Sequence, residues 1–189
     1  MIHQGLVSQV TAEVIILTMT ALGAGILMFV AGVVQKIMDD MDEQEFKRFL
    51  NKLDKTAMTE PFAVTIATLP VIALVPYFVV YGFGDWWFTA GLAVWLLGGS
   101  VVKSTNMSVY SWVANPENKN PEGLRRQRRK LHLSNNARGW ISLLSVVLMA
   151  CQFGQIEVAS AVAVGAMVAV PLLRLSRRYL PGTAPGTSA

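Results

Sequence analysis

The sequence has few charged residues, one cysteine and two histidines. Charged side chains make up 15% of the 189 residues and hydrophobic ones 53%, whereas a soluble domain has about 25% charged residues. Cys151 alone cannot form a disulfide within the chain. Two histidines leave too few ligands for a zinc or iron–sulfur site built from Cys and His. This composition predicts a membrane protein with no metal site of that kind.

Long uncharged runs predict an all-α integral membrane helical bundle. A helix rises about 1.5 Å per residue, so about 20 apolar residues cross a hydrocarbon core of about 30 Å. We expect a single bundle over residues 1–178, with four core helices and a fifth transmembrane helix. The spans are residues 14–34, 62–84, 86–102, 139–153 and 158–175.

The last two spans share one apolar region that is too long for a single crossing. We place the break at Gly154 and Glu157, and a count of four spans is the alternative. The third helix is expected to continue beyond Lys103 through Tyr110 and Trp112. Residues 179–189 are rich in Pro, Gly, Thr and Ser, which predicts a disordered tail.

Every lysine and arginine falls on one side of this topology, after the first, third or fifth span. The positive-inside rule makes that side cytoplasmic, or its organellar equivalent, and places the N-terminus outside. The basic cluster at residues 125–130 is expected to bind anionic lipid headgroups in the loop between spans three and four. The net charge of +4 is explained in this way without nucleic acid.

The connector after the first span predicts an amphipathic interfacial helix at residues 42–55. Asp42 and Glu45 have the spacing of a capping box, and the apolar residues recur at helical spacing: Phe46, Phe49, Leu50 and Leu53. This helix either lies on the inner leaflet or packs over the bundle. A lid or partner-docking helix is the alternative.

Small residues recur at four-residue spacing in two of the apolar runs. Ala21 and Gly25 form one seam, and Ala161, Gly165 and Ala169 form the other. Small side chains allow the backbones of transmembrane helices to approach closely. The seams predict helix packing within the bundle, in a homo-oligomer or in a larger membrane complex.

Four features together resemble a known family. They are the run GAGILMFVAGVV, the connector DEQEFKRFLNKLDKTAMTEPF, Asn106 after the third span, and Asn135 with Arg138 at the start of the fourth. Over residues 21–149 the chain is similar to a family of small integral membrane proteins of largely unknown function that includes the anthrone oxygenases. The resemblance implies a four-helix bundle, from which the fifth span departs.

The same resemblance implies a cofactor-independent oxygenase acting on a lipophilic anthrone-like or polyketide-like aromatic. An anthrone has an acidic C–H bond, and its carbanion can itself reduce dioxygen, so the protein supplies a base, an oxyanion stabiliser and an apolar pocket. We assign His132 as the base, Arg138 as the oxyanion partner, and Asn106 and Asn135 as neutral donors, with no cofactor and no metal.

Each of these residues also has a structural interpretation. Arg138 would snorkel towards the interface, Asn135 would cap the fourth span, and His132 would be an exposed loop residue. The alternative function is accordingly a non-catalytic transmembrane subunit or assembly factor of a larger membrane complex.

Overall fold

The computed structural model describes residues 8–179, and only the backbone of residues 63, 67, 101–103, 170 and 173–179 within that range. The described residues form helices and no strands, which confirms the all-α prediction. The chain divides into two compact units, Met1–Gln152 and Phe153–Ala189, and each is described by itself. The predicted tail lies outside the described residues except for Tyr179.

A long helical segment opens the first unit. It consists of α1 (Gln9–Phe29), the π-helix η1 (Val30–Val34) and α2 (Gln35–Asp40), which follow one another without a break. The side chain of Ser8 caps α1 by accepting a hydrogen bond from the backbone N–H of Thr11. The chain leaves the helical conformation at Met41, where the backbone is extended.

The predicted amphipathic helix is α3 (Glu43–Thr59), which extends four residues beyond the expected end. Both hydrogen bonds of the capping box between Asp42 and Glu45 are present, so this part of the prediction is confirmed. Phe46 and Leu50 are buried on one face of α3, which contacts α2, α5 and α6. The helix therefore packs over the bundle.

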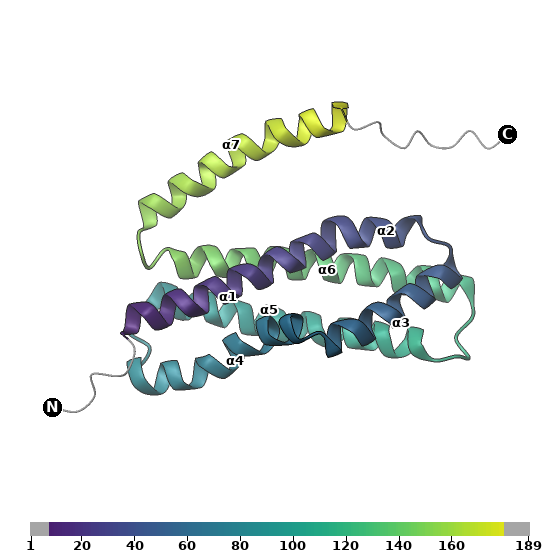
Figure 1. The fold of residues 1–189 in the computed structure, drawn as a ribbon, viewed down its shortest axis with the longest axis horizontal. Coiled ribbons are helices and arrows are strands. Elements are labelled where there is room, and N and C mark those ends of the chain that lie inside the picture. The colour runs from purple at the N-terminus through teal and green to yellow at the C-terminus, as the bar shows by residue number, and fades with distance from the viewer. Residues whose placement is uncertain (1–7, 180–189) are drawn as a thin grey trace. The chain divides into compact units, whose positions relative to one another are not determined.

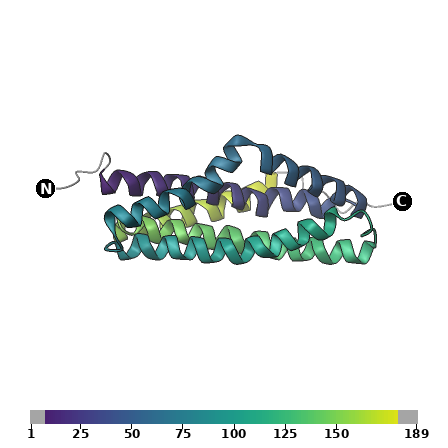
Figure 2. The same ribbon diagram turned by 90° about the horizontal axis from the view of Figure 1, so that it is seen from below.

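The next three helices complete the first unit. They are α4 (Pro61–Tyr81), which contains Pro70 and Pro76, α5 (Trp86–Ala114) and α6 (Pro121–Ala150). As expected, α5 continues well beyond residue 102. It packs along α6 in the most extensive helix pair of the unit, and α1 contacts both α4 and α6. Figures 1 and 2 show α5 and α6 side by side.

The basic cluster does not lie in a loop, because α6 begins at Pro121. Asn120 caps the helix by accepting from the backbone N–H of Glu122, and proline suits the first helical turn. Residues 125–130 are thus within α6. The expectation of a basic loop is therefore wrong. Charged residues mark the end of an apolar run, but they do not mark the end of the helix that contains it.

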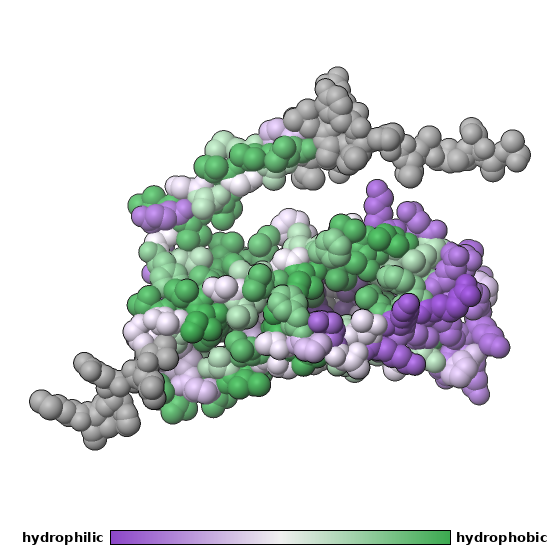
Figure 3. Space-filling view, in the orientation of Figure 1, coloured by the Kyte–Doolittle hydropathy of each residue, from purple (hydrophilic) through white to green (hydrophobic). Residues whose placement is uncertain are grey.

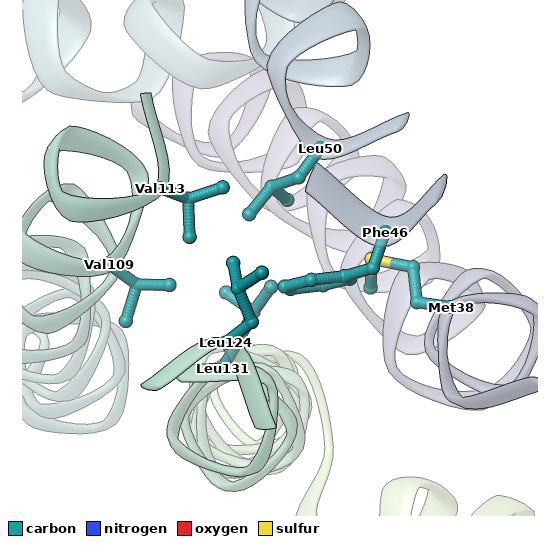
Figure 4. Close-up of a cluster of buried hydrophobic side chains, with 7 residues drawn as sticks. All are labelled: Met38, Phe46, Leu50, Val109, Val113, Leu124 and Leu131. Carbon is teal, nitrogen blue, oxygen red and sulfur yellow. The ribbon is translucent and has the colours of Figure 1, made fainter. Parts of the chain in front are cut away.

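Two clusters of buried apolar side chains pack the helices together at opposite ends of the first unit. One consists of Met38, Phe46, Leu50, Val109, Val113, Leu124 and Leu131, from α2, α3, α5 and α6. Figure 4 shows these side chains pointing toward one another between the helices. The other joins α1, α4, α5 and α6 through Ile16, Tyr77, Phe88, Leu92 and Met149.

Among the described residues, two helical stretches are long and apolar enough to cross a membrane, Gln9–Asp40 and Val64–Tyr81. Only 17% and 18% of their most apolar windows are buried, unlike the core helices of a soluble protein. Figure 3 shows hydrophobic side chains over much of the visible bundle, with hydrophilic ones gathered where α2 meets α3 and α5 meets α6. Membrane association is thus indicated, and the spans at residues 86–102, 139–153 and 158–175 stay predictions.

The second unit contains α7 (Gln155–Tyr179), with Pro171 inside the helix. Its start agrees with the predicted break after Phe153. The first fifteen residues of α7, Gln155–Ala169, form an apolar helix that is shorter than a candidate span.

The tightest glycine contacts between helices lie at positions other than those of the predicted seams. A Cβ added to Gly91 on α5 would lie 2.8 Å from the backbone oxygen of Ser145 and 2.8 Å from the backbone nitrogen of Met149. A Cβ on Gly98 would lie 2.1 Å from a side-chain carbon of Ile141. By contrast, a Cβ on Gly25 meets nothing within 4 Å. Glycine thus sets the distance between α5 and α6.

We expect Gly91→Ala to reduce the free energy of unfolding by about 1–3 kcal/mol, because backbone atoms must move to admit the methyl group. The matched change Gly25→Ala should cause no loss, since the added methyl enters open space and alanine favours a helix. Thermal unfolding in a mild detergent measures both. Equal losses would contradict the contact at Gly91.

Candidate functional site

A chain of hydrogen-bonded amides crosses the bundle at its hydrophilic end. Asn106 Nδ2 on α5 donates to Asn135 Oδ1 on α6 at 3.1 Å. Asn135 Nδ2 donates in turn to Gln35 Oε1 on α2 at 3.2 Å. All three side chains are buried. The amides therefore link three helices across an otherwise apolar interior.

The π-helix η1 sets the position of Gln35. The backbone N–H of Gln35 bonds to the carbonyl of Val30, five residues earlier, so the widened turn ends at this residue. Single π-helical turns within longer helices are frequent at functional sites. Here the wide turn lies directly before the point where the first helical segment joins the amide chain.

The chain continues outward to a histidine–aspartate pair. Gln35 Nε2 donates to Asp39 Oδ1 at 2.9 Å, one helical turn further along. Asp39 Oδ2 lies 3.1 Å from Nδ1 of His132, which is on α6. The side chains of His132 and Asp39 are 47% and 38% exposed, so this end of the chain reaches solvent.

The other end of the hydrogen-bond chain is the side chain of Asn106. Asn106 is 2% exposed, and no side chain or backbone group among the described residues donates a hydrogen bond to its buried Oδ1 atom. Such an unsatisfied atom costs about 1–3 kcal/mol.

The structure links three of the four predicted catalytic residues. Asn106, Asn135 and His132 belong to one network, although His132 joins it only through Asp39 and Gln35. Arg138, one turn beyond Asn135 on α6, is half-buried and interacts electrostatically with Tyr110. Within the described residues no hydrogen bond joins it to the amides.

Two of the structural interpretations are wrong for the same reason. Because α6 begins at Pro121, Asn135 cannot be its N-cap and His132 is not in a loop. Sequence reasoning missed Gln35 and Asp39. The available signal was their four-residue spacing at the end of an apolar run, which places two polar side chains on one face of a helix.

A second polar layer lies at the opposite end of the first unit. Glu13 on α1 is 1% exposed. Its carboxylate accepts from Tyr77 Oη at 2.6 Å, Gln152 Nε2 at 2.9 Å and Gln9 Nε2 at 3.0 Å. Gln9 Nε2 also donates to Asp85, the N-cap of α5. Neutral donors thus satisfy a buried carboxylate.

Between the two layers, a shallow apolar groove of about 730 Å³ runs along α1 and the end of α6. Its lining consists of Leu17, Thr18, Ala21, Leu22, Gly25, Ile26, Phe29, Val146 and Ala150. The predicted seam of Ala21 and Gly25 therefore faces open space within this unit. None of the four predicted catalytic residues lines the groove. In the described part of the chain, no group of three His, Cys, Asp or Glu side chains could hold a metal ion.

We expect Asn135→Ala to reduce the free energy of unfolding by about 1–3 kcal/mol, because it leaves both Gln35 Oε1 and Asn106 Nδ2 buried without this partner. The neighbouring Asn136→Ala removes an exposed amide and should change stability by less than about 0.5 kcal/mol. Thermal unfolding in detergent compares the two. Similar values for both variants would contradict the role of Asn135 as the central link.

Comparison with protein-family models, curated proteins and solved structures finds no match to this chain. The similarity to the anthrone oxygenase family accordingly stays a prediction.

Proposed function

We propose that this chain is an integral membrane protein in which the two polar layers mark the two faces of the hydrocarbon core. The observation that carries the proposal is their separation. Glu13 and Gln35 are 22 residues apart on a continuous helical segment, which corresponds to about 33 Å. A typical hydrocarbon core is about 30 Å thick.

Helix α5 gives a similar spacing. Asp85 at the start of α5 and Asn106 are 21 residues apart, or about 32 Å. Between the layers the outward side chains of the first unit include Val14, Ile15, Leu22, Ile26, Phe29, Val71, Ile72, Val75, Leu97 and Leu144. An apolar exterior bounded by polar layers is the arrangement that a lipid environment favours.

The distribution of charge supports an orientation. In the first unit the lysines and arginines lie either in α2 and α3, which come directly after Gln35, or near the amide end of α5 and α6. Lys103 and Arg138 are within one turn of Asn106 and Asn135, respectively. The positive-inside rule then makes the amide end cytoplasmic and the Glu13 end external.

The role that we favour is that of a non-catalytic subunit or assembly factor, in which the groove along α1 binds a transmembrane helix of a partner protein. Ala21 and Gly25 line this groove, and small residues permit close approach of a second helix. Thr18, which is the polar side chain among the described lining residues, donates its hydroxyl to the backbone oxygen of Val14 at 2.7 Å. The lining thus suits an apolar occupant.

One observation favours the second candidate, a cofactor-independent oxygenase. Asp39 can hold the Nδ1–H of His132 and so leave Nε2 free as a general base, and both side chains reach solvent. Asp39 would then be a positioning residue for the base.

Cysteine labelling tests the proposed embedding. In a Cys151→Ser background, Ser8→Cys and Lys36→Cys should react with membrane-impermeant reagents from opposite sides, because both positions are exposed and flank the apolar segment. Leu22→Cys, midway between the layers, should stay unlabelled until detergent is added. Labelling of both end positions from one side would exclude a crossing by this helix.

Turnover separates the two roles. For an oxygenase, His132→Gln should lower the oxidation rate of an anthrone by about 100-fold or more, as expected for loss of a general base, and Arg138→Ala should have a similar effect. For a subunit, the wild-type chain has no such turnover with metals chelated. The wild-type chain should instead copurify with a membrane partner in a fixed ratio, and the Gly25→Leu variant should not.

A further inference from the structure

We infer that Arg126, Arg129 and Lys130, on the exposed face of α6, form a binding site for the phosphate of an anionic phospholipid. The inference rests on the proposed membrane embedding and identifies which charges of the basic cluster are available. The sequence presents the cluster as a uniform run, whereas the structure divides it into two groups.

Arg125 and Arg128 are engaged within the protein. Arg125 Nε forms an ion pair with Glu43 at 2.6 Å, and the pKa of the Glu43 carboxyl is lowered by this hydrogen bond. Arg128 donates to the backbone oxygens of Asp39 and Asp42, at 3.3 and 3.1 Å. Its guanidinium also lies 4.7 Å from the centre of the Phe46 ring. These two arginines thus bind α6 to the end of α2 and the start of α3.

The other three basic residues of the cluster face outward. Arg126 and Arg129 are exposed, and within the described residues neither has an ion pair or hydrogen bond from its side chain. Lys130 Nζ donates to the hydroxyl of Ser108 at 3.1 Å, a neutral partner that leaves its charge uncompensated. Residues spaced three and four apart share one face of a helix. Arg126 therefore shares a face of α6 with Arg129 and Lys130, and one phosphate can lie within reach of all three.

Lys130 and Arg129 lie at the outer edge of the headgroup layer. Lys130 and Arg129 are five and six residues from Asn135 along α6, or about 8 and 9 Å beyond the amide layer. The headgroup region adds about 5–8 Å on each side of the hydrocarbon core. Arg126 lies one turn further out, about 14 Å beyond the amide layer and on the aqueous side of this region. Glu122, the acidic residue one turn beyond Arg126, is further still from the membrane.

The same face continues as an apolar stripe toward the membrane centre. Leu133, Trp140 and Leu144 follow Arg126 and Arg129 at helical spacing, and all three are exposed. A phosphate held by the two guanidinium groups would place an acyl chain along this stripe. A lipid thus fits the complete face, while a free phosphate would use only its basic part.

Native mass spectrometry of the full chain in mild detergent tests the site, with phosphatidylglycerol or phosphatidylcholine as the added lipid. We expect at least ten-fold preferential retention of phosphatidylglycerol. The double variant Arg126→Gln/Arg129→Gln should bind it about 30-fold more weakly, from the attraction of two basic residues to anionic lipid. Inorganic phosphate at equal ionic strength should not displace the lipid.

The matched control is Lys52→Gln/Lys55→Gln, which removes the same charge from exposed positions on α3. It should retain phosphatidylglycerol as the wild type does. An equal loss in both double variants, no preference in the wild type, or displacement by inorganic phosphate would each overturn the inference. Circular dichroism verifies that both variants are folded. Cysteine labelling of Ser8 and Lys36 tests the embedding separately, so failure of one proposal is distinguishable from failure of the other.

Discussion

The arrangement of the first unit depends on the need to satisfy polar side chains inside an apolar bundle. The hydrophobic effect is non-directional, whereas a hydrogen bond between buried side chains is lost within about an ångström. Glu13, Gln35 and Asn135 are each buried and bonded to side chains on other helices. These contacts fix the register of α1 against α4 at one end and of α2 against α6 at the other.

Close packing between α5 and α6 makes a further polar contact available. Ser145 Oγ donates to the backbone oxygen of Gly91 at 2.8 Å, at the same point where a Cβ could not be accommodated. The buried hydroxyl of Ser145 is thereby satisfied by a neighbouring helix. The glycine and the serine thus act together, because the short distance between the helices permits the hydrogen bond.

Local features of the fold were predictable from the sequence, and features that depend on helix faces were not. The capping box of α3 follows from the spacing of two nearby residues, and the break before α7 follows from the length of the last apolar run. The seam of Ala21 and Gly25 has the correct spacing for packing, yet Gly91 and Gly98, seven residues apart, make the tight contacts. Spacing identifies a face with small residues, but only the fold decides whether another helix covers it.

The candidate site shows the same division. Asn106 and Asn135 were identified through the resemblance to the anthrone oxygenase family, while Gln35 and Asp39 join the site next to a π-helix that periodicity did not predict. His132 was assigned alone, and its partner Asp39 is 93 residues away in the sequence. Contacts over such distances follow from how α2 and α6 pack.

The two polar layers differ in the sign of the charge near them, which gives the bundle a direction. At one end, the carboxylates of Glu13 and Asp85 share the amide of Gln9, a neutral donor. At the other, neutral amides are buried and charged residues lie outside them, including arginines that bind the ends of α2 and α3. Buried polar groups therefore set the position of each helix, and the exposed basic residues supply the asymmetry on which a membrane orientation depends.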